Sequence, residues 1–343
     1  MRTPFLAVLL VLGLGGCAQR GPLGRNPQSE GSSNTAWERV KDRAGPHRFQ
    51  EACKPLHVMP PAGVPVRGKV ILIHGFTACP QQFFEWSERL RAEGWISYFL
   101  LMPGHGRSPT ATGKEDFEFV PGHQKIDDYA QLASDAVELA RGDSLPTVIV
   151  GLSVGGAVAL DAVLEAPESF DRALIVSPFF AVSNDLLRHF GVPVLGRVPF
   201  IQEKMIGWGA PCVEEMRLGR AGICNFRLHQ LLTAQLYGKS VYAKARPVDT
   251  RIQILGVQND GAASNAWIEA TAQMLGLGTE DDVSACFYGA GANHSLFSRF
   301  DSPAEDKFWM DSLLESATDF ADHGARFASE PSESGKTFPT CRL

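Results

Sequence analysis

The sequence has no excess of basic residues and no apolar run long enough to cross a membrane. Its 343 residues include 32 Lys and Arg against 38 Asp and Glu, which gives a net charge of −6. We expect no nucleic-acid partner, because the cations that such binding requires are missing. Apolar residues make up 44% of the chain and charged residues 20%, as in globular proteins generally. This composition excludes collagen, a disordered tail protein and a multi-span membrane protein.

Cysteine occurs seven times, but no two cysteines form a Cys-x-x-Cys pair, and no ordered histidine motif accompanies them. The spacing therefore predicts no zinc site, and we expect no metal ion. An odd number of cysteines leaves one thiol over once the others are paired. The first residues of the chain offer an explanation for the seventh.

Residues 1–16 are typical of a targeting segment. Arg2 is followed by the apolar run 5–14, which is far shorter than the roughly 20 residues of a spanning helix. The sequence Leu14-Gly15-Gly16-Cys17 then resembles the bacterial lipoprotein signal. The resemblance implies cleavage after residue 16, a lipid on Cys17, and attachment to the bacterial cell envelope. The residue after Cys17 is Ala18 rather than Asp, and by the same resemblance this favours export to the outer membrane over retention in the inner membrane. The alternative is an ordinary secretory peptide with a buried Cys17.

Six cysteines remain if Cys17 carries a lipid. An even number in an oxidising compartment predicts disulfides, with 15 different full pairings. Cys212 and Cys224 are the nearest pair in sequence, and a disulfide between them would close a surface loop. The alternative is that some of the six are buried free thiols. The six are Cys53, Cys79, Cys212, Cys224, Cys286 and Cys341.

Short apolar runs alternate with helix-like stretches through the middle of the chain. The runs are nearly continuous, which is typical of strands covered on both faces. This alternation predicts an α/β fold with a doubly wound, mostly parallel sheet. The predicted strands are 70–73, 96–102, 147–150, 173–176, 252–257 and 284–288, and the predicted helices are 81–93, 126–141, 154–165, 265–275 and 306–320.

The alternation predicts a core in two pieces, residues 51–178 and 246–325. The interval 179–245 has no clean strand run but has apolar, helix-like pieces, so we expect an inserted helical cap rather than a long surface loop. Residues 17–50 are rich in Gly, Pro, Ser and charged side chains, and we expect them to form a tether. Residues 326–343 have the same character and form the predicted C-terminal tail.

The motif Gly151-Leu152-Ser153-Val154-Gly155 lies between a predicted strand and a predicted helix. A nucleophile elbow needs a sharp turn at this junction, with tiny residues two positions before and after the nucleophile. Ser153 is the only serine in the chain with glycine at both positions. We therefore expect Ser153 to be a nucleophile.

The segment His74-Gly75-Phe76 follows the predicted strand 70–73. Acyl transfer passes through an oxyanion, which two preorganised N–H groups can stabilise. We expect these donors to be the backbone N–H groups of Phe76 and of Val154, the residue after the nucleophile. A structural role for His74 is favoured over direct catalysis.

With Pro103-Gly104-His105-Gly106, these motifs resemble the serine α/β-hydrolases, and specifically the bacterial carboxylesterase and monoacylglycerol-lipase-like branch. The similarity covers roughly residues 68 to 320. It implies an eight-stranded sheet, a cap after the strand that ends near residue 176, and the chain order Ser, Asp, His. It also implies a structural role for His105 and no cofactor.

Two residues match the remaining positions of that order. Asp260 follows the predicted strand 252–257, where the chain turns, and His294 lies on the loop after the last predicted strand. The competing acids Asp281, Asp282 and Asp306 are expected at the surface. The competing base, His323, falls in or after the final helix.

These residues predict a serine hydrolase acting on small acyl esters through Ser153, His294 and Asp260. The alternatives are a thioesterase, peptidase or acyltransferase on the same triad, or a surface protein without activity, because fold alone does not identify a substrate. The acyl and alcohol parts of the substrate, the membrane face and the oligomeric state are not encoded in any motif.

Overall fold

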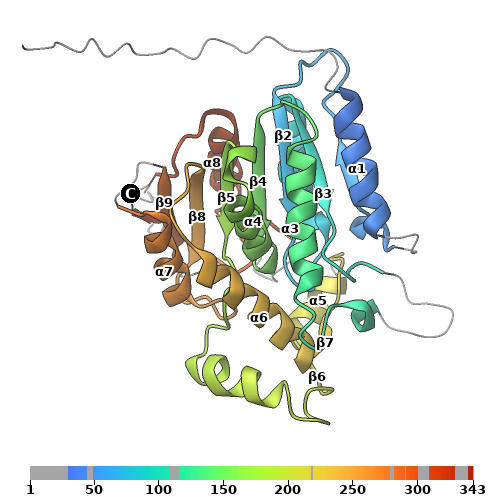
Figure 1. The fold of residues 1–343 in the computed structure, drawn as a ribbon, viewed down its shortest axis with the longest axis vertical. Coiled ribbons are helices and arrows are strands. Elements are labelled where there is room, and N and C mark those ends of the chain that lie inside the picture. The colour runs from blue at the N-terminus through green and yellow to red at the C-terminus, as the bar shows by residue number, and fades with distance from the viewer. Residues whose placement is uncertain are drawn as a thin grey trace, which may run out of the picture.

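An eight-stranded sheet runs through the middle of the computed structural model, which describes residues 30–44, 49–107, 116–217, 219–278, 282–289, 291–299, 309–328 and 339–342 (Figure 1). Its order is β1-β3-β2-β4-β5-β8-β9-β10. The six inner strands are parallel, as predicted. They are β2 (Gly68–Ile73), β3 (Trp95–Leu100), β4 (Thr147–Leu152), β5 (Arg172–Val176), β8 (Arg251–Val257) and β9 (Val283–Tyr288).

The two edge strands are antiparallel to their neighbours, and the sequence did not predict them. β1 (Leu56–Val58) pairs with β3, and β10 (Thr340–Arg342) pairs with β9. Each has only three residues, which is too short to produce a recognisable apolar pattern. With them, the sheet has the eight strands and the α/β-hydrolase architecture that the resemblance implied.

Alternate residues of the inner strands enter two separate apolar cores. In β2, Ile71 and Ile73 face one core, whereas Val70 and Leu72 face the other. This explains why the strands are apolar at every position. The first core is covered by α1 (Glu30–Ala44), α3 (Asp127–Ala140), α4 (Val154–Glu165) and α7 (Asn265–Leu275), and the second by α2 (Phe84–Ala92) and α8 (Met310–His323).

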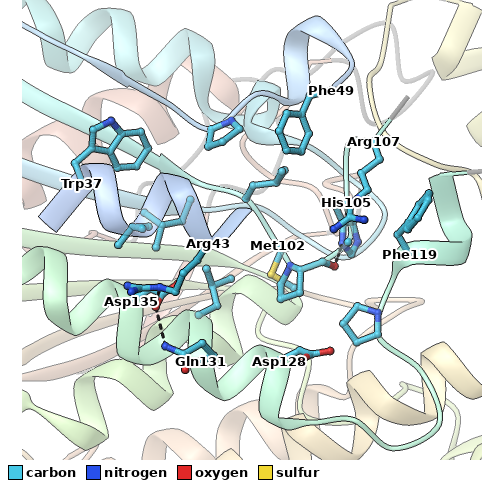
Figure 2. A pocket seen from close by; sticks show the side chains of 18 residues that line it. Trp37, Arg43, Phe49, Met102, His105, Arg107, Phe119, Asp128, Gln131 and Asp135 are labelled. Atoms are coloured by element: carbon cyan, nitrogen blue, oxygen red, sulfur yellow. Dashed lines mark hydrogen bonds and ion pairs between the residues drawn. The ribbon is translucent and has the colours of Figure 1, made fainter. Parts of the chain in front are cut away.

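The helix α1 differs from the tether expected over residues 17–50. Ala36, Trp37 and Val40 are buried, and the Trp37 ring lies 5.4 Å from the ring of Tyr98. The side chain of Trp37 is 2% exposed, and Figure 2 shows it among the side chains that line a cavity beside α1. Three apolar side chains among many polar ones gave too weak a periodic signal to predict a helix. Cys17 and the signal segment 1–16 lie outside the described residues.

The segment between β5 and β8 contains the helices of the predicted cap (Figure 1, yellow-green to gold). It also contains a two-stranded antiparallel ribbon, β6 with β7, that was not predicted. Leu232 and Val241 of this segment belong to the first core, so α6 packs against the body of the protein. Its elements are the π-helix η6 (Leu187–Leu195), β6 (Met205–Gly207), α5 (Ala210–Arg217), β7 (Asn225–Arg227) and α6 (Leu228–Lys244).

Four short 3-10 helices complete the described elements. They are η2 (Glu51–Cys53), η3 (Pro80–Phe83), η4 (Asp116–Phe119) and η5 (Pro167–Ser169). None of the helices in the described ranges combines the length and apolar character of a membrane-crossing segment.

Six cysteines form three disulfides: Cys53–Cys79, Cys212–Cys224 and Cys286–Cys341. The second is the pair that the sequence spacing favoured, and the alternative of buried free thiols is wrong for these six. The third joins β9 to β10 at directly opposed positions, so it fixes the tail to the sheet edge. The first attaches η2 to the loop after β2.

Because Trp37 is fully packed, we expect Trp37→Ala to lower the free energy of unfolding by about 3–5 kcal/mol. Denaturant unfolding of the purified chain measures this value. Glu38→Ala is the matched control, since Glu38 is exposed and pairs with Lys41 at the surface, so its loss should cost less than about 0.5 kcal/mol. A loss below about 1 kcal/mol for Trp37→Ala would show that α1 contributes little to stability.

Candidate active site

Ser153 occupies the turn between β4 and α4 with φ 59° and ψ −120°. Positive φ is costly for a residue with a side chain, so the surroundings must hold it there. Its N–H donates to the carbonyl of Val176 at 2.9 Å, and its carbonyl accepts from the N–H of Phe179 at 2.9 Å. The neighbouring strand and the start of the cap therefore fix this conformation from both sides.

The glycines that flank Ser153 are required by close backbone approach. A Cβ on Gly151 would collide with the carbonyl of Gly155, and a Cβ on Gly155 would collide with the carbonyls of Ile73 and His74. Helix α4 thus sits directly against β4 and β2. This is the geometry of a nucleophile elbow, and it presents the Ser153 hydroxyl at the amino end of α4.

Asp260 and His294 meet at the same edge of the sheet. Asp260 Oδ2 accepts a hydrogen bond from His294 Nδ1 at 2.7 Å, and its Oδ1 accepts from the N–H groups of Ala262 and Ala263 at 2.7 and 3.0 Å. Burial raises the pKa of Asp260, but the His294 charge and these hydrogen bonds outweigh it, so the pKa is lowered overall. An ionised Asp260 keeps the proton on Nδ1 and leaves Nε2 of His294 able to accept one.

Ser153 and His294 line one cavity of about 190 Å³, together with Phe76 and Val154. Within the described part of the chain, no hydrogen-bond partner occupies the backbone N–H of Phe76 or of Val154. Val154 is the first residue of α4, so its N–H also lies at the positive end of the helix dipole. The four residues thus bring a hydroxyl, an imidazole and two available N–H donors to one cavity.

Two buried histidines support the loop that carries Phe76. His74 Nε2 accepts from the N–H of Met102 at 3.0 Å, and His105 Nε2 accepts from the N–H of Thr77 at 3.1 Å. Burial lowers the pKa of His105 to about 4 and that of His74 well below its usual value. Both rings are therefore neutral at pH 7, which lets each Nε2 act as an acceptor. They position the loop and do not face the cavity lined by Ser153.

Thr77, which follows Phe76 with φ 67°, is held from the other side by the cap. Trp208 Nε1 donates to Thr77 Oγ1 at 2.8 Å, and the N–H of Ile223 donates to the Thr77 carbonyl at 2.9 Å. Arg220 Nη2 lies 3.4 Å from the same carbonyl. The sequence did not predict this contact, because no motif joins residues about 140 positions apart.

The buried guanidinium of Arg220 also pairs with the carboxylate of Glu215 at 3.4 Å, and both side chains line the cavity. Arg220 Nη1 lies 2.9 Å from Sγ of Cys212, within the disulfide to Cys224. The cap therefore supplies one charged, internally neutralised wall to a cavity that is otherwise mainly apolar. Its apolar lining includes Phe76, Leu152, Phe179, Trp208 and Leu231.

A second cavity, of about 290 Å³, lies between α1 and α3 and is lined by none of the predicted catalytic residues, although His105 lines it (Figure 2). Three of its polar side chains pair with one another. Arg43 Nε lies 2.8 Å from Asp135 Oδ1, and Gln131 Nε2 donates to the same oxygen at 2.9 Å. This cavity lies where α1 packs against the rest of the protein. The hydroxyl of Ser153 and the imidazole of His294 line the other cavity.

The residues predicted for the site lie together: Ser153, Asp260 and His294, with Phe76 and Val154. Of the competing residues, Asp282 pairs with Arg251 and His323 ends α8, and neither lines the cavity. Asp281, Asp306 and the predicted lipidation residue Cys17 lie outside the described residues. The cap residues Trp208, Glu215 and Arg220 are the part of the site that sequence reasoning missed.

Comparison with known proteins identifies the family and the fold of the chain. The family described as "Serine aminopeptidase, S33" matches residues 64–284. No curated protein matches the chain.

Among solved structures, a monoacylglycerol lipase from Paleococcus ferrophilus is similar with a TM-score of 0.59 and 18% identity, over 79% of this chain and 100% of that one. A soluble variant of the Saccharomyces cerevisiae monoglyceride lipase gives 0.57 and 18%, over 78% and 90%. A carboxyl esterase from Bacillus coagulans gives 0.53 and 14%, over 77% and 91%. At these identities the likeness establishes the fold.

The lowered pKa of His105 predicts a pH-dependent stability. Unfolded His105 takes up a proton near pH 6.5 and folded His105 only near pH 4, so the free energy of unfolding falls as the pH drops through this window. His105→Gln should reduce the slope of that fall by up to about 1.4 kcal/mol per pH unit. Urea unfolding of both proteins between pH 7.5 and 4.5 measures the slopes.

The two proteins are compared by the slope of the free energy of unfolding against pH. An overall loss of stability in His105→Gln therefore does not affect the result. His189→Gln, at an exposed position, controls for the loss of an imidazole. Equal slopes for wild type and His105→Gln would contradict a buried, neutral His105.

Proposed function

The chain belongs to the serine aminopeptidase S33 family, and from that premise we propose that it is a serine hydrolase that cleaves carboxylic esters. The observation that carries the proposal is the cavity in which Ser153, in the elbow conformation, lies with His294, whose Nδ1 is bound to the buried Asp260. A hydroxyl, a base and a carboxylate that orients the base are the parts of an acyl-transfer triad.

In the proposed reaction, His294 Nε2 accepts the proton of Ser153 as Oγ attacks the ester carbonyl. The N–H groups of Phe76 and Val154 bind the oxyanion that forms. The tetrahedral species collapses when His294 returns the proton to the departing alcohol, which leaves an acyl group on Ser153. Water, deprotonated by His294, then attacks this ester, and the acid departs as Ser153 regains its proton. Asp260 stabilises the imidazolium in both halves.

The exposed apolar side chains of the cap support the proposal that the substrate carries an apolar acyl group. Leu186, Phe190 and Phe200 are 72%, 68% and 91% exposed, which is unusual for large apolar side chains. They lie on the same inserted segment as Trp208 and Leu231, which line the cavity. This combination favours lipid-like esters such as monoacylglycerols over strongly polar substrates.

The family description makes peptidase activity the main alternative. A free carboxylate in the cavity would favour an aminopeptidase, because it pairs with the amino group of the substrate. Among the described residues, Glu215 is the acid that lines the cavity near Ser153, and it is paired with Arg220 at 3.4 Å. The charged wall is thus neutralised, which favours ester hydrolysis. Thioesters and acyl transfer to alcohols use the same triad and are distinguished only by assay.

Replacing Ser153 by Ala should abolish hydrolysis of aryl esters, lowering kcat by about 10⁴-fold or more, because the nucleophile is lost. Labelling by a fluorophosphonate probe should disappear in the same variant. Ser134→Ala, on the distant helix α3, is the matched control and should retain both.

Undiminished hydrolysis by purified Ser153→Ala would refute the assignment. A panel of esters with acyl chains of two to sixteen carbons, run beside matching thioesters and aminoacyl anilides, then identifies the substrate class. Preferred cleavage of the anilides would replace the esterase proposal by the peptidase alternative.

We also propose that the mature chain begins at a lipidated Cys17 and is held in the bacterial cell envelope, in the outer membrane. The support is the sequence Leu14-Gly15-Gly16-Cys17 after a short apolar run. Disulfides among the six other cysteines are in keeping with export to an oxidising compartment.

Cys17→Ser should move the protein from the membrane fraction to the soluble fraction and prevent incorporation of labelled palmitate. Ser32→Ala, beyond the motif, is the control. Retention of Cys17→Ser in the membrane fraction, with unchanged labelling, would contradict lipidation at this residue.

A further inference from the structure

A second group of potential ligand side chains lies at the junction of the cap and the core. His123 precedes α3 in the core, Glu203 precedes β6 in the cap, and His229 is the second residue of α6. All three line a cavity of about 390 Å³ that contains none of the triad residues. They are far apart in the sequence, so their spacing along the chain gave no indication of a metal site.

The ligand atoms of the three side chains converge. Glu203 Oε1 lies 3.7 Å from His123 Nε2, and Glu203 Oε2 lies 3.6 Å from His229 Nε2. One atom from each residue lies within 4.8 Å of the others. These contacts are longer than hydrogen bonds. They are close to the edge of about 3.4 Å expected between ligands of one tetrahedral ion at 2.0–2.1 Å.

The loop that carries His123 is shaped to hold it over α6. His123 and Gln124 both have positive φ, 51° and 65°, although neither is glycine. The N–H of Gln124 donates to Thr233 Oγ1 at 3.0 Å, one helical turn beyond His229. As a result the two imidazole rings are stacked, with centroids 3.9 Å apart. Strained backbone of this kind persists where the surroundings enforce it and is concentrated at functional sites.

The positions of the other two side chains, His229 and Glu203, are also fixed by their neighbours. His229 is 5% exposed, and its ring lies over Gly122, where a Cβ would collide with it. Its Nδ1 is buried and has no hydrogen-bond partner among the residues that the structure describes. The N–H of His229 donates to the carbonyl of Gln202 at 3.1 Å, which places the next residue, Glu203, beside the ring.

The charge around the site suits a cation. The cavity is lined by three carboxylates, from Glu118, Asp128 and Glu203, and by two cationic side chains, Lys125 and Arg227. Arg227 lies between two of these carboxylates, with Nη1 3.4 Å from Glu203 Oε2 and Nη2 3.9 Å from Glu118 Oε1, so it orients the Glu203 carboxylate. Second-shell contacts of this type commonly position a ligand.

We propose that His123, Glu203 and His229 bind a divalent transition-metal ion of the Zn²⁺ class and thereby tie the cap to the core. Two imidazoles and one carboxylate form a typical Zn²⁺ ligand set, with a fourth position left for water. Because two ligands belong to the cap and one to the core, binding stabilises the docked cap and so the folded chain.

The test uses the untagged mature chain, freed of metal by a chelator and dialysed against Zn²⁺. One ion per chain is expected for the wild type. His123→Gln and Glu203→Gln should each weaken binding at least ten-fold, and both side chains are exposed, so neither change disturbs the fold. His189→Gln, an exposed histidine elsewhere in the cap, is the matched control and should bind as the wild type does.

Thermal unfolding gives an independent measurement. Zn²⁺ should raise the Tm of the wild type and of His189→Gln but not of the two ligand variants. Equal binding by all four proteins would show adventitious binding and overturn the proposal, as would less than one ion per wild-type chain at saturation. Neither measurement depends on ester hydrolysis, so the outcome is separate from that of Ser153→Ala.

Discussion

The backbone at Ser153 is the constraint on which the site depends. A positive φ at a residue with a side chain is unfavourable by itself, and it persists because β5, through Val176, and the start of the cap, through Phe179, bond to Ser153 on either side. The same turn requires glycine at positions 151 and 155, since any side chain there would strike backbone. The proposed nucleophile, the helix dipole at its side and one proposed oxyanion donor therefore all follow from a single packing requirement.

The positions of the other proposed catalytic groups follow from the parallel pairing of the strands. β5 lies between β4 and β8, and β9 lies beyond β8, so the loops that leave the carboxyl ends of β8 and β9 emerge at the same edge of the sheet as the turn at Ser153. Asp260 and His294 are on those loops. The pairing of the strands is sufficient to bring the two side chains into their 2.7 Å contact. Residues more than 100 positions apart in the chain thus meet because the strand order brings their loops together.

This logic also explains what the sequence could predict. Continuous apolar runs predicted the six inner strands, and residues near strand ends predicted Ser153, Phe76, Asp260 and His294 for the site, because both signals are local. The edge strands β1 and β10 have three residues each, and Ala36, Trp37 and Val40 are the buried apolar residues among the described side chains of α1, so neither the edge strands nor α1 produced a pattern. The contacts of Arg220 and Trp208 with Thr77 depend on how the cap folds back, which no local signal encodes.

The cap is accordingly a structural part of the proposed oxyanion site. Thr77 follows directly after Phe76, and two of its polar atoms are bound by the cap, so a shift of the cap would move the N–H of Phe76. The disulfide Cys212–Cys224 closes the segment that makes these contacts and restricts such a shift. On the opposite side of Phe76, His105 bonds to the N–H of Thr77 from the core. Held between a neutral histidine and the cap, the loop keeps its donor in place before any substrate arrives, which is what electrostatic stabilisation of an oxyanion requires.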